Sequence, residues 1–374
     1  MRILFIFLTL FIFGLQSYSQ SKEYVVSCVG FYNLENLYDT IDDPKTNDEE
    51  FLPTGAKLYT GSLYKEKLNH MATVIGMMAK ELTPDGIALL GVAEVENRLV
   101  LEDLCKQPEL SKNNFSIVHF DSKDYRGVDV GLLYNPKYFT PEHSEALFVP
   151  LPSRDTIPNY TRDILYVYGK FDGEPMHFFV NHWPSRRGGE EASAPRRALA
   201  SSIARAKIDS ILAADPNAKI VLMGDLNDDP VSPSLVKVMK SQGNASKMDN
   251  NMMFNPWTNL YKNGIGTLAW NDSWNLFDQV LISNKFLQRE QNGFFYKQPV
   301  IFNKDFMCQH TGNFKGYPLR TFVGNEYAGG YADHFPVYVV LLKEKNEIIP
   351  LINWLFILFR FSCDCSNRTR ISAY

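Results

Sequence analysis

One pattern constrains the fold of this chain more than any other: apolar segments of strand length run directly into carboxylate, amide or imidazole side chains. Between these segments, residues 64–82 and 193–214 carry apolar side chains at helical spacing. Strands that alternate with helices, without an internal repeat or a Pro- or Gly-rich linker, predict one α/β domain with two sheets. The expected strands are residues 24–32, 87–95, 115–119, 129–134, 163–171, 176–182, 219–223 and 335–342.

Polar side chains collect where the strands end. Strand ends at one edge of a sheet can converge on one cleft, and several carboxylates in a cleft repel each other unless a cation is present. Oxygen ligands of this type suit Mg²⁺, with Mn²⁺ or Ca²⁺ as alternatives, and zinc is disfavoured because no H-x-x-x-H or C-x-x-C spacing occurs. The clusters stand at residues 33–36, 94–97, 181–182, 225–228, 278–279 and 333–334.

Each of these residues also has an ordinary structural explanation when it is taken alone. Gly224-Asp225 suits a turn, and His182 suits a half-buried histidine with a hydrogen-bond partner. The repetition of the pattern at six places is what favours a functional site.

Composition excludes several classes of protein. The 374 residues carry a net charge of −4, and 13% of them are aromatic. These values exclude a disordered chain and a globally basic protein that wraps nucleic acid. The five cysteines are too few and too scattered for a disulfide framework, so packing must hold the fold.

The two ends differ from the middle. Arg2, an apolar run over residues 3–15 and the small residues Ser17 and Ser19 are typical of a signal peptide, residues 1–19, cleaved after Ser19. This predicts a secreted or periplasmic protein, with an N-terminal anchor helix as the alternative. Residues 20–345 would form the domain. The tail, residues 346–374, is apolar and then polar with Cys363 and Cys365; a docking segment, weak membrane association or an extension foreign to the domain all remain open.

Six strings in this order resemble the endonuclease/exonuclease/phosphatase family, which includes pancreatic deoxyribonuclease, and in particular its secreted bacterial nucleases. The resemblance covers about residues 24–342 and implies a four-layer α/β sandwich, with two mixed β-sheets packed face to face, helices outside and the site at one edge. The strings are Asn33-Leu34-Glu35-Asn36, Val92-Ala93-Glu94-Val95, Asn181-His182, Gly224-Asp225-Leu226-Asn227, Asp278-Gln279-Val280 and Asp333-His334.

The resemblance also implies roles for individual residues. Glu94 would be the principal metal ligand, with Glu35 as a second one, and Asp333 would bind the metal or position His334. Asp225 would orient or deprotonate the attacking water, and His334, oriented by Asp278, would stabilise the phosphorane or act as the base. Asn33 would donate a hydrogen bond to the phosphate or to a ligand carboxylate, and Asn227 would fix the phosphate. His182 would contact the phosphate or protonate the leaving oxygen.

Arginines follow the His182 cluster. Arg186 and Arg187 stand in a Gly-containing loop, and guanidinium groups bind phosphate through paired hydrogen bonds. A solvated loop is the alternative. The polar loop at residues 125–129 makes a weaker case of the same kind.

These observations predict an exported, metal-dependent phosphodiester hydrolase, most simply an endonuclease on DNA or RNA. A phospholipid head group or a small phosphoester is the alternative substrate. A binding module that kept the fold and lost the chemistry is a less favoured alternative, because no expected ligand position holds an apolar residue. Mg²⁺ is the expected cofactor, and no stable protein partner is predicted.

Overall fold

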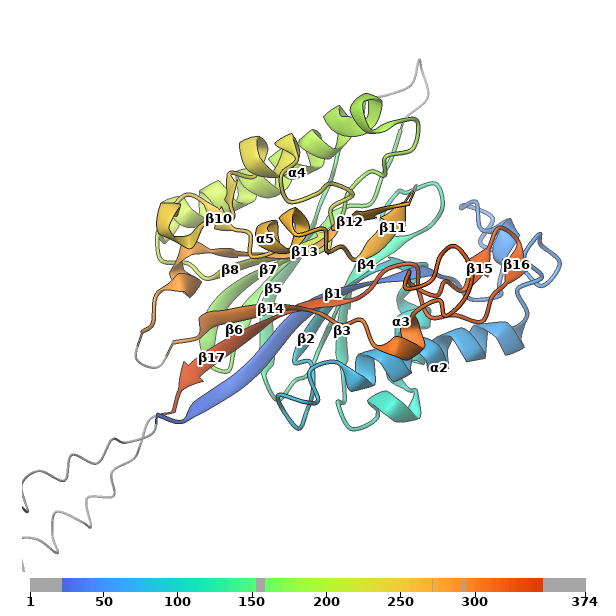
Figure 1. Cartoon of the computed structure of the whole chain (residues 1–374), viewed down its shortest axis with the longest axis horizontal. Helices are drawn as coiled ribbons and strands as arrows, with labels where there is room; N and C mark the ends of the chain where they lie inside the picture. The colour runs from blue at the N-terminus through green and yellow to red at the C-terminus, as the bar shows by residue number, and fades with distance from the viewer. Residues whose placement is uncertain (1–21, 153–158, 271, 291–292, 346–374) are drawn as a thin grey trace, which may run out of the picture. The chain divides into compact units, whose positions relative to one another are not determined.

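The computed structural model describes residues 22–152, 159–270, 272–290 and 293–345 (Figure 1). The predicted signal peptide and the predicted tail with Cys363 and Cys365 lie outside the described residues. The chain divides into two units, one of which is Val26–Lys343. The other comprises the two ends, and its described part is residues 22–25 with 344–345. In that small part, Lys22 pairs with Glu344 and Lys345 pairs with Glu23.

Two large mixed sheets dominate the structure. The first has the strand order β14-β17-β1-β2-β4-β3 and the second the order β5-β6-β7-β8-β13-β10-β9. Strands β1 and β2 are parallel, as are β7 and β8, whereas β4 and β13 run antiparallel to their neighbours β2 and β8. In the first sheet the strands are β1 (Tyr24–Leu37), β2 (Leu89–Val95), β3 (Ser116–His119), β4 (Asp129–Tyr134), β14 (Phe295–Ile301) and β17 (Val337–Glu344). In the second they are β5 (Phe139–Leu147), β6 (Ile164–Phe171), β7 (Glu174–His182), β8 (Ile220–Asp225), β9 (Ser241–Gln242), β10 (Met253–Phe254) and β13 (Asp278–Ser283).

The remaining elements are short or helical. Two small hairpins pair β11 (Leu268–Trp270) with β12 (Ser273–Asn275), and β15 (Phe322–Val323) with β16 (Glu326–Tyr327). The α-helices are α2 (Gly61–Met77), α3 (Arg98–Cys105), α4 (Glu190–Ala214) and α5 (Thr258–Lys262). Single helical turns are η1 (Glu49–Phe51), η2 (Pro108–Leu110), η3 (Ser234–Val238), η4 (Ala245–Lys247), η5 (Asn284–Leu287) and η6 (Asp305–Met307).

The two sheets pack closely against each other at Gly91. A Cβ atom at this position would lie 2.7 Å from Sδ of Met223 and 3.0 Å from Cγ1 of Val180, both on the facing sheet. Any side chain there would displace these packed side chains. A glycine in β2 therefore allows the two sheets to approach where the strands lead into the polar clusters.

Helices cover the outer faces of both sheets (Figure 1). The first sheet packs against α2 and α3 in one apolar cluster, and the second sheet packs against α4 in another. The buried face of α4 has a four-residue spacing, the distance between successive turns of a helix. It consists of Ala200, Ala204, Ile208 and Leu212. The expected α/β class with two mixed sheets is confirmed.

Three elements differ from the sequence expectation. Helix α2 ends at Met77, because Ala79 adopts a left-handed backbone, so Leu82 is exposed instead of extending the apolar face. Helix α4 begins at Glu190, which places Pro195 inside the helix and not in its first turn. Strand β5 was not expected, because it is a polar edge strand with a bulge after Pro141 and lacks an apolar pattern.

Packing, and not crosslinking, holds the described domain. Cys28, Cys105 and Cys308 are free thiols, as the sparse cysteine count predicts.

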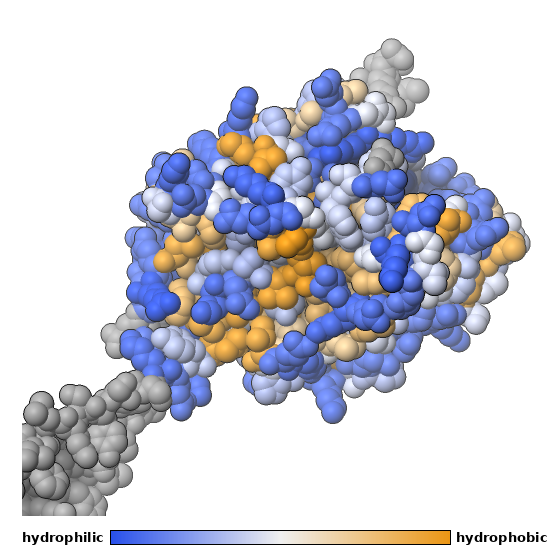
Figure 2. Space-filling model, in the orientation of Figure 1, coloured by the Kyte–Doolittle hydropathy of each residue, from blue (hydrophilic) through white to orange (hydrophobic). Residues whose placement is uncertain are grey.

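In Figure 2 apolar residues gather near the centre of the viewed face, with hydrophilic side chains around them. None of the helices in the described ranges has the length and hydropathy needed to cross a bilayer.

Candidate active site

The polar ends of strands from both sheets meet in one cleft of about 860 Å³. Its lining includes Glu94 at the end of β2, His182 at the end of β7, and Asp225 at the end of β8. In the second sheet, Asp225 lies between His182 on parallel β7 and Asp278 on antiparallel β13. His334, just before β17, lines the same cleft. The structure thus brings these residues together from positions far apart in the chain.

The backbone departs from regular strand geometry where the site residues stand. Glu35, Glu94 and Asn227 have φ angles of 48°, 58° and 49°, in a left-handed region that side chains other than glycine seldom adopt. The register of β1 with β2 shifts after Asn33, and that of β2 with β4 shifts across Glu94. Bulges of this kind redirect a side chain relative to the strand. Local irregularity therefore directs these side chains toward the site.

Glu94 is a carboxylate with one oxygen held and one oxygen facing the cleft. Its Oε2 accepts a hydrogen bond from the backbone N–H of Asn36 at 3.0 Å. Its Oε1 lies 3.7 Å from Nε2 of His182 and 3.7 Å from a terminal nitrogen of Arg126. These contacts are too long for strong hydrogen bonds. The Oε1 atom is therefore available to an additional ligand.

Asp225 is buried and held in a fixed orientation. Its Oδ1 accepts the backbone N–H of Asn227 at 3.0 Å, and its Oδ2 accepts the amide Nδ2 of Asn33 at 3.1 Å. Nε2 of His334 lies 3.9 Å from the same Oδ2. Burial raises the pKa of Asp225 to about 7, although the nearby His334 opposes this shift. A carboxylate with such a pKa is suited to accept a proton near neutral pH.

His334 and Asp278 form a buried pair. Nδ1 of His334 lies 2.7 Å from Oδ2 of Asp278, and this oxygen also accepts the hydroxyl of Thr267 at 2.6 Å. Burial by itself would lower the pKa of His334, but Asp278 and Asp333 raise it well above the usual value. The imidazole is therefore held as a cation whose Nε2 is directed toward Asp225.

His182 has the opposite electrostatic character. Burial and the positive charges of Arg162 and Arg126 hold its pKa well below the usual value. Its Nε2 lies 3.7 Å from Glu94 and 3.7 Å from Asp225, and its Nδ1 is buried with no hydrogen-bond partner among the described residues. A neutral imidazole at this position can donate a hydrogen bond to a phosphate oxygen, but it is not a ready proton donor at neutral pH.

Two predicted metal ligands lie beside the main cleft and share an arginine. Asp333 pairs with Arg320, whose Nε lies 3.7 Å from Oε1 of Glu35. Oε2 of Glu35 accepts the backbone N–H of Thr321 at 2.8 Å, and burial raises the pKa of Glu35 to about 7. Glu35 and Arg320 line a separate cavity of about 180 Å³. A cation held by Glu35 or Asp333 would therefore have to compete with Arg320.

The two predicted phosphate-binding arginines have different surroundings. Arg187 lines the cleft and donates a hydrogen bond to the hydroxyl of Tyr125 at 3.3 Å. Arg186 is not among the residues that line the cleft. It donates to the backbone oxygen of Asn227 and to the carboxylates of Glu190 and Asp229, at 2.9–3.0 Å. Arg187 therefore lies at the site, whereas Arg186 stabilises the loop that follows Asp225.

Arg162, which no sequence pattern singled out, lines the cleft beside His182. Its guanidinium donates to Asp124 at 3.1 Å and to the backbone oxygen of Trp183 at 2.7 Å. Its Nε is buried with no hydrogen-bond partner among the described residues. Arg162 comes just before β6, which runs antiparallel to β7. The start of β6 therefore lies at the edge where β7 ends. Residues just before an antiparallel strand can thus reach the site, although they do not stand at the end of a strand.

The donors around the cleft fit a hard divalent cation. Glu94 and Asp225 supply carboxylate oxygens, whereas none of the three described cysteines lies in the cleft. Asp225, Asp278 and His334 each offer one ligand atom within 4.8 Å of the others. Oδ2 of Asp278, however, already accepts hydrogen bonds from His334 and Thr267. Oxygen donors suit Mg²⁺ or Mn²⁺, and the facing oxygen of Glu94 is the donor least occupied by the protein.

Solved structures with the same fold include proteins from bacteria and animals. An endonuclease/exonuclease/phosphatase family protein from Bacteroides thetaiotaomicron is 16% identical, has a TM-score of 0.50, and covers 87% of this chain and 97% of its own. TDP2 from Caenorhabditis elegans is 13% identical at a TM-score of 0.50, covering 87% of this chain and 77% of its own. D. rerio TDP2, solved with a single-strand DNA product, is 12% identical at a TM-score of 0.50, covering 84% and 98%. At these identities the likeness establishes the fold alone.

The sequence itself identifies the family. No curated protein matches the chain, but the sequence profile of the endonuclease/exonuclease/phosphatase family matches residues 28–343. This match spans both large sheets and every residue of the predicted site. The chain therefore belongs to the endonuclease/exonuclease/phosphatase family, whose members are divalent-metal-dependent hydrolases of phosphoester bonds.

Proposed function

We propose that this chain is an exported phosphodiesterase that cleaves nucleic acid with the help of Mg²⁺. The observation that carries the proposal is the position of His182, whose Nε2 lies 3.7 Å from both Glu94 and Asp225. A phosphate group beside this imidazole would lie between Glu94, which can bind a cation, and Asp225, which can accept a proton.

The residues of the chain divide the chemistry between them. Asp225, fixed by Asn33 and Asn227, accepts the proton of the attacking water. His334, cationic because of Asp278, stabilises the negative charge that develops on the phosphoryl oxygens. His182 donates a hydrogen bond to a non-bridging oxygen. A divalent cation bound through Glu94 would neutralise phosphate charge and act as a Lewis acid.

The lining of the cleft supports a polyanionic substrate. Besides the catalytic groups, it includes Arg126, Arg162, Arg187 and Arg196, which can contact phosphates beyond the scissile one. Tyr125 and Tyr160 line the same cleft and are 56% and 37% exposed, so bases could stack on them. The nucleic-acid product found with D. rerio TDP2 is consistent with this assignment. The overall charge of −4 does not oppose it, because the arginines place positive charge locally.

The size of the cleft favours a second candidate, a small phosphoester. Its volume of about 860 Å³ is within the range of pockets that bind small molecules, roughly 300–1,000 Å³. A head-group or sugar phosphate would use the same catalytic residues and leave the outer arginines unused.

A substrate panel tests the proposal. The purified protein would be assayed with single-stranded DNA, plasmid DNA, RNA, sphingomyelin and a sugar phosphate, each with Mg²⁺ and with EDTA. We expect EDTA-sensitive cleavage of a nucleic acid that is lost in Asp225→Asn. Hydrolysis of the sugar phosphate alone would establish the second candidate, and no EDTA-sensitive hydrolysis of any compound would refute the enzyme assignment.

Export requires its own measurement. The predicted cleavage after Ser19 implies a mature chain that begins at Gln20. Mass spectrometry of the protein recovered from the culture medium or periplasm should give that N-terminus. If the protein stays inside the cell and still carries residues 1–19, the proposal of export would be contradicted.

A further inference from the structure

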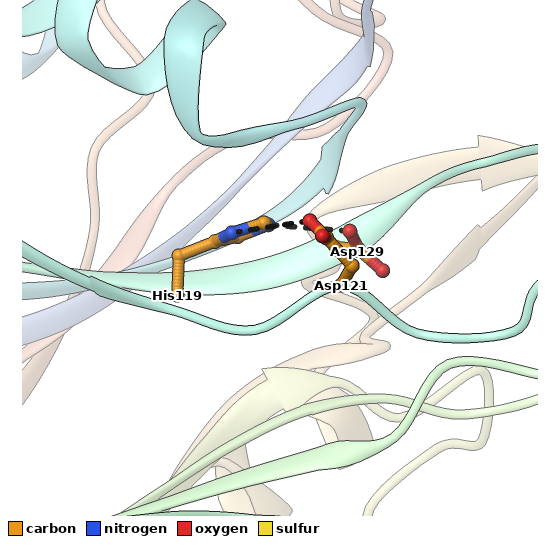
Figure 3. A group of neighbouring side chains, drawn as sticks. All are labelled: His119, Asp121 and Asp129. Atoms are coloured by element: carbon orange, nitrogen blue, oxygen red, sulfur yellow. Dashed lines mark ion pairs between the residues drawn. The ribbon is translucent and has the colours of Figure 1, made fainter. Parts of the chain in front are cut away.

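A second group of metal-ligating side chains lies on the first sheet, outside the cleft described above. It consists of His119 at the end of β3, Asp129 at the start of β4, and Asp121 in the loop between them. One potential ligand atom from each residue lies within 4.8 Å of the others. Figure 3 shows both carboxylates beyond the outer edge of the His119 ring, with dashed lines between them and the ring. The group escaped the sequence analysis because two antiparallel strands bring it together, without a linear spacing motif.

The histidine in this group has an unfilled bonding position. The His119 side chain is only 2% exposed, and its Nε2 makes no hydrogen bond to any described residue. Oδ2 of Asp129 is 3.2 Å from this nitrogen, but the two atoms do not have the geometry of a hydrogen bond. A protonated imidazole in an ordinary ion pair would aim its N–H at the carboxylate. The observed relation is different.

The distance between these two atoms suits two ligands of one metal ion. At metal–ligand distances of about 2.0–2.1 Å, neighbouring ligands in a tetrahedral site lie roughly 3.3 Å apart, each directed at the ion and not at the other. The Nε2–Oδ2 distance of 3.2 Å agrees with this value. Oδ1 of Asp121 lies 3.8 Å from the other ring nitrogen, Nδ1, and this side chain is 86% exposed, so it can rotate toward Nε2 to provide a third ligand from the solvent side.

The local charge also favours a cation. Asp129 is 5% exposed, and its other oxygen, Oδ1, accepts the backbone N–H of Ser122 at 2.8 Å. Asp163 lies close by: with Asp129 it lines a small void, and its Oδ1 is buried without a hydrogen bond among the described residues. Lys123 is a cation close to Asp163, and it stacks over Phe148 and Tyr160. Two carboxylates thus lie beside the imidazole, and Asp163 lies beside one of them, Asp129.

We propose that His119, Asp121 and Asp129 bind a structural divalent transition-metal ion of the Zn²⁺ class. An imidazole nitrogen with carboxylate oxygens suits Zn²⁺ better than Mg²⁺, which prefers oxygen ligands alone. The ion would close the base of the loop at residues 120–128. This loop carries Arg126 to its contact with Glu94 and Asp124 to its contact with Arg162. The ion would therefore stabilise a wall of the cleft without touching the substrate.

Zinc binding can be measured apart from catalysis in the Glu94→Gln variant, which weakens the cleft as a metal site. The full-length protein, stripped with EDTA, would be dialysed against Zn²⁺ and its metal content determined. We expect Asp121→Ala, added to this background, to weaken the binding of one Zn²⁺ by about tenfold or more, since even indirect partners of a ligand change affinity 10–100-fold. Asp305→Ala is the matched control, because Asp305 is also exposed and lies 4.0 Å from the exposed His310.

A direct signal from His119 completes the test. Zn²⁺ should shift the imidazole nitrogen resonances of His119 in the Glu94→Gln protein, and Mg²⁺ at the same concentration should not. Hydrogen exchange in residues 120–128 should slow when Zn²⁺ binds. Equal Zn²⁺ binding by the Asp121→Ala and Asp305→Ala proteins, with no change in the His119 resonances, would overturn the proposal. That result would leave the assignment of the catalytic cleft intact.

Discussion

Oδ2 of Asp278 accepts from two partners at once, Nδ1 of His334 at 2.7 Å and the hydroxyl of Thr267 at 2.6 Å. Because the carboxylate accepts a hydrogen bond from Nδ1–H, the other ring nitrogen is directed toward Asp225. Asp278 therefore controls both the orientation and the charge of the catalytic imidazole, although it does not line the cleft itself.

Asp278→Asn should lower kcat by roughly 10²–10⁴-fold, because an amide neither stabilises the imidazolium nor selects its orientation. KM should change little, since Asp278 does not contact the substrate. Steady-state kinetics on the substrate identified by the panel would measure both. Thr267→Val, which removes only the second hydrogen bond, should have a smaller effect on kcat, and an equal effect would show that orientation of Asp278 matters more than its charge.

The metal-free protein should lose stability as the pH rises from about 4 to about 7. The pKa of Asp225 is raised by burial from 3.8 to about 7, so the folded state binds this proton more tightly than the unfolded state. The stabilisation is fully present below about pH 4 and disappears as the pH passes 7. Urea unfolding in EDTA at several pH values should therefore give a flatter profile for Asp225→Asn. If the stabilities of the two proteins depend on pH in the same way, the raised pKa of Asp225 would be contradicted.

Arg186→Ala and Arg187→Ala form a matched pair with different expected defects. Loss of Arg186 leaves the buried Asp229 without its cation and should lower the free energy of unfolding by about 3 kcal/mol, the lower end for a broken buried pair because Arg186 is 18% exposed. Loss of Arg187, which lines the cleft, should raise KM about tenfold with little change in stability. Thermal unfolding and kinetics would separate them, and the reverse assignment of defects would refute this division.

Glu94→Gln should raise the Mg²⁺ concentration needed for half-maximal activity by about tenfold or more. An amide oxygen is a weaker ligand than a carboxylate, and Oε1 of Glu94 is the donor that faces the cleft. Glu96→Gln is the control two residues away. Burial raises the pKa of Glu96 to about 8, so its carboxyl group is largely protonated at pH 7 and resembles an amide. Equal Mg²⁺ requirements in the two variants would exclude Glu94 as a ligand.

The apolar strands and the polar groups at their ends could be predicted because burial leaves a periodic signal. The segment at 129–134 matches β4, and Glu94, His182 and Asp225 do lie at the ends of strands. Asp278 and His334 do not, since Asp278 begins β13 and His334 precedes β17. Residues before a strand were harder to assign. Arg162 precedes β6 and Arg126 precedes β4, and only the antiparallel pairing of these strands brings their starts to the site.

The hydrogen bonds and ion pairs of individual side chains could not be predicted from the sequence either. Arg186 and Arg187 are identical neighbours in the chain, yet one supports a loop and the other lines the cleft. The shared arginine of Glu35 and Asp333 likewise depends on the fold, because Arg320 comes from a loop that had no recognisable pattern.

The left-handed backbone at Glu94 and Asn227 places the needs of the site in conflict with those of the fold. Glycine adopts this conformation without steric cost, so a glycine at either position would relax the chain while removing a catalytic group. A laboratory selection for heat resistance alone would therefore not preserve the side chains that the reaction needs at these two positions. Screens for a more durable enzyme should keep both codons fixed and vary the sequence elsewhere.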